Sequence, residues 1–201
     1  MPKISQERRD GRRMQILEAA WRCFYRTGLH ETTMQEIIRD SGLSAGAVYL
    51  YFPSKEEIIL TAIRTSLAGV RALIGELLEK DDYDSLPHLV ERIATAIDQF
   101  ATRDGYDLRS IALLGWSEAQ TNARVCEAMV PIYQEFLSQL RVAVKRSQER
   151  GIVDGRVSAD SAATVLLSLL LGNVVQFALL RNGPTRKIVK GARSMYEKPD
   201  K

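Results

Sequence analysis

Residues 44 to 55 combine small, aromatic and basic side chains in one short helical stretch. Its candidate functional residues are Ser44, Ala45, Gly46, Ala47, Tyr49, Tyr51 and Lys55. A glycine inside a helix costs about 1 kcal/mol relative to alanine, so a core helix gains nothing from Gly46. Small residues near the start of a helix allow a phosphate or a base edge to come close. They also suit a tight helix–helix contact, so the pattern has two interpretations.

The residues before this stretch predict a helix, a turn and a second helix. Thr33 and Glu36 have the spacing of a capping box, so a helix begins at residue 34. Gly42 supplies the left-handed residue that ends this helix, and Ser44 caps the next one two residues later. A turn this short makes the two helices cross at a steep angle, as in a helix-turn-helix unit.

The second helix of this unit is predicted to pack through one face only. Val48 and Phe52 are four residues apart and anchor it, which leaves the other side chains on its remaining faces. Pro53 restricts the residue before it and so ends the helix. Ser54 and Glu57 form a second potential capping box, which opens a long third segment.

The whole pattern resembles the DNA-binding signature of the TetR/AcrR family of bacterial transcriptional regulators. The resemblance covers about residues 10 to 60 and rests on Gly46-Ala-Val-Tyr49-x-Tyr51-Phe52-Pro-Ser-Lys55-Glu56-Glu57, preceded by Thr33 and Ser44. It implies that the second helix enters the major groove of operator DNA. Residue by residue, it implies phosphate contacts from Thr33, Ser44, Tyr49, Tyr51 and Lys55, and base-edge contacts from Ala45, Gly46 and Ala47.

This sequence has alanine at positions 45 and 47, where many members of that family have long or polar side chains. Alanine forms no side-chain hydrogen bond with a base. Ala45 and Ala47 therefore favour apolar contact with thymine methyl groups, or readout of DNA shape, over hydrogen-bond readout. The function that the resemblance implies is a sequence-specific transcriptional regulator, acting as a repressor that releases its operator on binding a small, mostly apolar effector.

The amino terminus adds positive charge just before the helix-turn-helix pattern. Residues 1 to 13 contain five basic residues against two acidic ones, a surplus of three that equals the formal net charge of the whole chain. The basic residues are Lys3, Arg8, Arg9, Arg12 and Arg13. A basic arm at this place fits phosphate or minor-groove contact, although soluble termini are often basic as well.

The remaining sequence predicts an all-α protein without a sheet. Apolar periodicity and cap residues predict helices at about 6–27, 34–41, 45–51, 55–79, 86–101, 108–119, 123–150 and 159–181, with a last one from about residue 184. Pro131 is expected to kink or end the seventh. The predicted domains are a DNA-binding domain over 1–55, with its helix-turn-helix at about 33–52, and an effector-binding and dimerisation domain over 56–201. The fourth helix runs continuously from one into the other.

The segment from about 159 to 181 is apolar on nearly all sides, which marks a helix that is buried or crosses a membrane. Three polar residues, Ser168, Asn173 and Gln176, argue against a membrane span. We expect one face to pack inward and another against a second subunit. With the last helix, this would form a four-helix homodimer interface. The predicted interface residues are Val165, Leu166, Leu170, Val174, Phe177, Ile188, Ala192 and Met195.

Aromatic residues recur on several helices of the predicted second domain. With two polar residues near the apolar centre, they are predicted to line a cavity for a mostly apolar effector, although ordinary core packing explains any one of them equally well. The predicted ligand-binding residues are Phe100, Tyr106, Trp116, Tyr133, Phe136, Asn173, Gln176 and Phe177.

Signals of catalysis are missing from the sequence. It has no glycine-rich phosphate loop, no nucleophile elbow and no CxxC pair, and neither of its two histidines has a histidine or cysteine three or four residues away. We therefore predict no catalytic residues, no metal, no cofactor and no enzymatic activity. The alternatives are an all-helical enzyme with scattered catalytic residues and a protein-interaction adaptor that does not bind DNA.

Cellular location follows from the two cysteines and the amino terminus. Cys23 and Cys126 are predicted to be buried free thiols, as expected in a reducing cytoplasm. The amino terminus lacks the apolar core of a signal peptide. We expect a cytoplasmic protein with no membrane partner.

Overall fold

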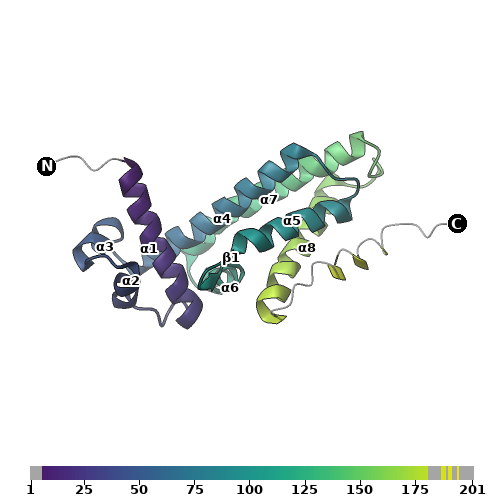
Figure 1. Cartoon of the computed structure of the whole chain (residues 1–201). Coiled ribbons are helices and arrows are strands. Elements are labelled where there is room, and N and C mark those ends of the chain that lie inside the picture. Colours follow the sequence, from purple (N-terminus) through teal and green to yellow (C-terminus); the bar gives the residue numbers. More distant parts are fainter. Residues whose placement is uncertain (1–5, 181–186, 189, 192–193, 195–201) are drawn as a thin grey trace. The chain divides into compact units, whose positions relative to one another are not determined.

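The computed structural model describes residues 6–180 together with 187, 188, 190, 191 and 194. The described chain is almost entirely helical, as predicted, and the helix boundaries agree closely with those expected from periodicity and caps (Figure 1). The helices are α1 (Gln6–Thr27), α2 (Met34–Ser41), α3 (Ala45–Tyr51), α4 (Lys55–Lys80), α5 (Leu86–Ala101), α6 (Leu108–Ala119), α7 (Ala123–Glu149) and α8 (Ala159–Leu180). α7 continues through Pro131 instead of ending there. Most of the predicted last helix lies outside the described residues.

The prediction that the chain has no sheet is wrong in one place. Strands β1 (Thr102–Arg103) and β2 (Tyr106–Asp107) pair antiparallel between α5 and α6. The turn between them contains Asp104 and Gly105, and the glycine adopts a φ of +82°. An Asp-Gly pair favours tight hairpins because it tolerates this left-handed conformation. Two residues per strand are too few to produce a detectable alternating pattern.

The chain divides into two compact units that differ from the predicted domains. The first consists of Met1–Ser66 with Thr102–Met129, and the second of Leu67–Ala101 with Val130–Lys201. The difference arises because α6 and β2 pack against α1, which joins them to the amino-terminal helices. A functional division at residue 55 stays a prediction. In the structure, α4 and α7 each contribute residues to both compact units.

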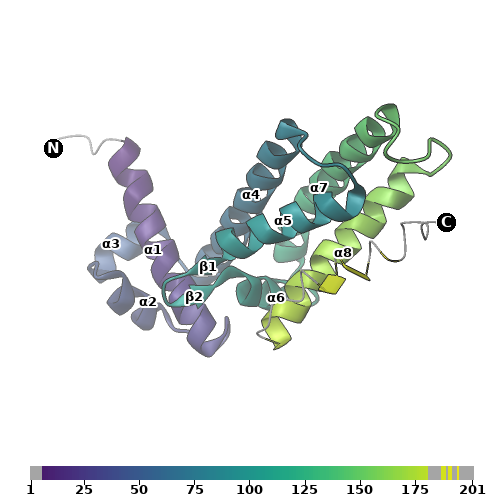
Figure 2. The same ribbon diagram turned by 45° about the vertical axis from the view of Figure 1, so that its right-hand side comes forward.

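The first unit is built around α1, which lies against α2 (Figure 2). Its fully buried side chains come from all four of the first helices, and include Ile16, Leu17, Phe24, Ile37, Val48, Phe52 and Ile58. Arg22 and Arg26 of α1 both pair with Asp40 of α2, with the shorter N–O distance at 2.7 Å. The core therefore fixes α2 and α3 on α1.

The second unit consists of parts of α4 and α7 with α5 and α8, which run side by side (Figures 1 and 2). α5 contacts α8 directly. Among its fully buried side chains are Leu89, Val90 and Ile93 of α5 and Leu140 of α7. On α8, Leu166 and Leu170 face this core.

Two helices, α4 and α8, are long and apolar enough to cross a membrane by length and composition alone. The core helix of a soluble protein meets the same criterion, so this is weak evidence for a span. α8 also buries the polar side chain of Asn173, which is 2% exposed.

Candidate nucleic-acid interface

A complete capping box fixes the start of α2. Thr33 Oγ1 accepts a hydrogen bond from the Glu36 N–H at 3.2 Å, and the Thr33 N–H donates to Glu36 Oε2 at 2.7 Å. The predicted box is confirmed. The backbone hydrogen bond from Thr33, with a second from its hydroxyl, lowers the pKa of Glu36 because both favour the ionised carboxylate.

The turn between α2 and α3 is held on both sides. Gly42 ends α2 in the left-handed region, with a φ of +67°. Ser44 Oγ accepts the N–H of Ala47 at 3.3 Å and so caps α3. Gln15 of α1 donates to the carbonyl of Ser41 at 2.8 Å. Each predicted signal of the helix-turn-helix unit therefore has its structural counterpart, and α1 braces the turn.

One face of α3 is buried and the opposite face is open. Val48 and Phe52 are 0% and 1% exposed, as predicted for the anchors of this helix. Arg13 of α1 lies over the Phe52 ring at 4.6 Å and donates to Thr61 of α4, so it is occupied inside this unit. On the outer side, Tyr49 is 48% exposed.

Gly46 lies on the outer face with open space around it. A Cβ added at Gly46 would meet no heavy atom within 4 Å, among the described residues outside its own turn. Its φ lies outside the left-handed region. The alternative of a tight helix–helix contact therefore finds no support in the described residues. Ala45 is likewise exposed, and Ala47 is half-buried.

The predicted phosphate ligands differ in how free their polar groups are. The hydroxyl of Thr33 donates to Glu36 Oε2 at 2.9 Å, so it already serves the capping box. No acceptor within the described residues takes the Ser44 hydroxyl hydrogen, which therefore stays available to donate. Tyr49 is exposed and Tyr51 half-buried at the end of α3. Phosphate contact by these residues stays a prediction.

Lys55 has a role that sequence reasoning missed. Its Nζ donates to the carbonyl oxygens of His30 at 2.6 Å and of Thr32 at 2.8 Å. An ammonium group has three donors, so two are taken by the loop between α1 and α2 and one is left. Lys55 therefore positions the loop that leads into α2, whatever it adds at a phosphate.

We expect Lys55→Ala to destabilise the first unit by about 1 to 3 kcal/mol, because two charge-assisted hydrogen bonds are lost. Chemical denaturation followed by circular dichroism measures this, with Lys80→Ala at the other end of α4 as control. The salt dependence of DNA binding separates the two roles. A slope lower by about 1 unit marks a direct phosphate contact as well. Unchanged stability would show that the bonds to the loop contribute nothing.

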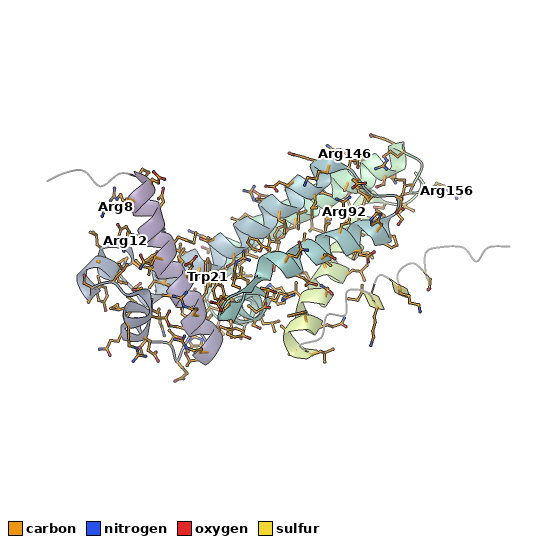
Figure 3. All side chains as sticks on the ribbon, viewed as in Figure 1. Arg8, Arg12, Trp21, Arg92, Arg146 and Arg156 are labelled. Atoms are coloured by element: carbon orange, nitrogen blue, oxygen red, sulfur yellow. The ribbon has the colours of Figure 1, made fainter. Side chains whose placement is uncertain are left out.

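Part of the predicted basic arm lies in α1. Arg8 and Arg12 lie on the amino-terminal half of α1, ahead of the buried Trp21 (Figure 3). Arg12 donates to Gln15 at 2.9 Å on the exposed side of the helix. Lys3 lies outside the described residues.

The predicted effector-binding residues fall into both compact units. Tyr106 and Trp116 belong to the first, where Tyr106 is buried and stacks on Trp21 at 5.9 Å. The other six belong to the second, where Tyr133 and Phe136 meet edge to face at 5.7 Å. Their role in effector binding stays a prediction.

The second unit contains a cavity of about 510 Å³ that none of these eight residues lines. It lies between the start of α5, the first half of α8 and the loop at 152–157. Most of its lining is aliphatic and includes Leu86, Val90, Ile152, Val157, Val165 and Leu169. Its volume is in the usual range for small-molecule sites. The predicted site rested on aromatic residues, and the lining of this cavity contains none.

The five predicted dimer-interface residues on α8 are divided between its buried and its less buried sides. Leu166, Leu170 and Val174 are at most 8% exposed within the chain itself, so little of their surface is left for a second subunit. Val165 is 43% exposed, and Phe177 and Ile188 are half-buried. Ala192 and Met195 lie outside the described residues. Two residues that the prediction omitted, Leu179 and Leu180, are 69% and 61% exposed.

No group of three potential metal ligands lies together in the part of the chain that the structure describes. The prediction of two buried thiols holds for Cys23, whose pKa is raised by burial. It is wrong for Cys126, which is exposed near the start of α7. Cys126 lies on the exposed face of α7. The apolar pattern of the sequence did not distinguish this face from the buried face of the helix.

Comparison with known proteins supports the interpretation of α2 and α3 as a DNA-binding helix-turn-helix unit. The family model described as "Bacterial regulatory proteins, tetR family" matches residues 16–62. The HTH-type transcriptional regulator YfiR of Bacillus subtilis (strain 168) is 47% identical over 73 residues, which is 36% of each chain. The regulator LmrA of the same organism is 24% identical over 85% of this chain and 88% of its own.

Solved structures extend the similarity to the whole fold. Salmonella enterica GusR superimposes with a TM-score of 0.73 over 98% of this chain and 100% of its own, at 21% identity. At this identity, the likeness concerns the fold alone. The match with YfiR covers only about a third of that protein.

Proposed function

Because the chain belongs to the tetR family of helix-turn-helix DNA-binding regulators, we propose that it binds operator DNA as a homodimer in the cytoplasm and releases it on binding a small apolar effector. The observation that carries the DNA-binding part is the open face of α3. A capped turn, braced by Gln15 and anchored by Val48 and Phe52, holds that face outward. Helix-turn-helix proteins place this second helix in the major groove. We propose no enzymatic activity.

Selection from a random DNA library with the purified full chain tests this function. We expect enrichment of a palindromic site, because a two-fold dimer presents two α3 helices to successive major grooves about 34–36 Å apart. The logarithm of the binding constant should fall linearly with the logarithm of the salt concentration, with a slope of about −0.9 per phosphate contact. An adaptor or an enzyme without DNA binding would enrich no sequence.

We propose that the effector occupies the cavity between α5, α8 and the 152–157 loop. Its aliphatic lining suits a mostly apolar molecule. The cavity lies entirely in the second unit. This differs from the predicted aromatic site, and the two locations can be separated by substitution.

Ala162 lines the cavity and is half-buried, so Ala162→Trp should fill part of the space. We expect effector affinity to fall by about tenfold or more, equal to about 1.4 kcal/mol. Operator affinity should stay within about twofold, because Ala162 and α3 belong to different compact units and share no contact partner. Thr164→Trp is the control, since Thr164 is an exposed neighbour on α8 outside the lining. Thermal shift with a screened effector measures the response. An intact response, together with its loss in Tyr133→Leu, would favour the aromatic site instead.

Contacts inside the first unit suggest how the signal reaches α3. Arg124, at the start of α7, pairs with Glu56 at 3.0 Å and Glu57 at 2.6 Å, at the start of α4. His30 Nε2, in the loop before α2, lies 3.0 Å from the carboxylate of Glu118 on α6. We propose that movement of α4 and α6 on effector binding displaces the helix-turn-helix unit through these contacts.

A further inference from the structure

Leu50 has the most exposed of the large apolar side chains in the part of the chain that the structure describes, at 74%. A single exposed leucine is ordinary on a protein surface and has no meaning by itself. The position of Leu50 on α3 makes its exposure informative. Val48 and Phe52, two residues before and after it, are buried in the core. Leu50 therefore lies on the face of α3 that turns away from the protein.

The residue one helical turn before Leu50 is Gly46. Side chains of a helix lean toward its amino terminus, so Leu50 leans toward the turn that contains Gly46, which has no side chain. A Cβ at Gly46 would meet nothing within 4 Å, and its φ is not left-handed. The fold does not require this glycine, which weakens the helix relative to alanine. Leu50 and the bare backbone at Gly46 therefore lie on the same outer face of α3, one helical turn apart.

The outer positions of α3 limit which bases it can recognise. Among the exposed side chains of α3, only that of Tyr49 has a hydrogen-bonding group, and its hydroxyl is predicted to contact a phosphate. Ala45, Gly46 and Leu50 have none, and neither does the half-buried Ala47. Bidentate recognition of guanine or adenine requires arginine, lysine, asparagine or glutamine, and recognition of cytosine requires an acceptor. Thymine differs, because its C5-methyl group projects into the major groove and is recognised by apolar contact.

We propose that Leu50 is a specificity-determining residue, which contacts the C5-methyl group of a thymine in each operator half-site while Gly46 lets the base edge approach. This inference rests on the proposed DNA binding. It adds a residue that the family resemblance left without a role, and it names the base that the residue recognises.

Replacement of thymine by deoxyuridine tests the contact directly, because it removes only the C5-methyl group. The experiment uses the operator selected with the full chain and replaces one thymine pair at a time, symmetrically in both half-sites. Fluorescence anisotropy at fixed salt measures the binding. We expect one pair of positions at which affinity falls by about fourfold per half-site, the factor that corresponds to burying one methyl group.

Leu50→Ala should remove this sensitivity. In that variant, deoxyuridine at the same positions should cause no further loss, whereas effects at other thymines should persist. Because Leu50 is exposed, the unfolding temperature should not change. Val142→Ala is the control, since Val142 is 45% exposed on α7, and it should bind like the wild type. Equal deoxyuridine effects in wild type and Leu50→Ala would overturn the proposal.

Gly46→Ala provides a second, independent variant. The added methyl group meets nothing in the protein, so the unfolding temperature should stay the same or rise. Operator binding should nevertheless weaken by about fivefold to 100-fold, the range produced by one surplus methyl group in a well-packed contact. Unchanged operator binding would contradict a close approach at Gly46.

The outcomes distinguish this inference from the function on which it rests. If selection enriches no DNA sequence, the proposed function fails. If an operator is enriched but no thymine is sensitive to loss of its methyl group, DNA binding stands and the role of Leu50 is wrong.

Discussion

Replacement of Val165 and Leu179 by glutamate is expected to convert the proposed dimer into monomers and to weaken operator binding by about 100-fold or more. Both residues lie on α8, and they are 43% and 69% exposed. A two-fold interface repeats each substitution, so four carboxylates would be buried without partners. Binding of the second half-site is intramolecular only in a dimer, and this coupling contributes a factor of about 10² to 10⁴.

The substituted positions must be exposed within one chain, so that the glutamates affect the interface and not the folding of the second unit. Leu170 and Val174 are 3% and 8% exposed within the chain, so a glutamate at either would disrupt the second unit itself. Val142→Glu is the control, because Val142 is exposed on α7, outside the predicted interface. Sedimentation equilibrium measures the mass and anisotropy the DNA affinity. A wild type that is monomeric at micromolar concentration, or a double variant that stays dimeric, would contradict the proposed interface.

Local signals explain why the helix-turn-helix unit could be predicted from sequence. Thr33, Gly42 and Ser44 act on neighbours within a few residues, and each does in the structure what its residue type predicts. The hairpin was missed because its ladder has two residues per strand. Its Asp104-Gly105 turn was the available signal.

Long-range contacts explain what the sequence could not reveal. Lys55 bonds to carbonyls more than twenty residues upstream, and nothing in its neighbourhood predicts that geometry. Val165 and Leu170 are both apolar residues of one all-apolar helix, yet one is exposed and the other buried. Only the helices packed around α8 decide which face is inward. The role of Leu50 depends on its exposure, which an apolar residue between two tyrosines does not reveal in the sequence.

Effector and operator are expected to weaken each other's binding by the same factor, of about 5 to 150. The structural basis for this expectation is α4, whose residues belong to both compact units. At 1.5 Å per residue its 26 residues span about 39 Å. A dimer that reads two successive major grooves tolerates little change in the spacing of its α3 helices. An effector that favours another spacing must therefore compete with operator DNA.

Isothermal titration calorimetry with an effector found by thermal shift measures this coupling. The effector is titrated into free protein and into protein saturated with operator, and the operator affinity is measured with and without the effector. An effector that binds the two spacings equally well shifts nothing, however tight its binding. A tenfold difference corresponds to about 1.4 kcal/mol, so efficient release requires a larger preference at both sites of the dimer. Random DNA of equal length is the control, since it should leave effector affinity unchanged. Equal effector affinities with and without operator would mean that DNA binding by this regulator is not controlled through the second unit.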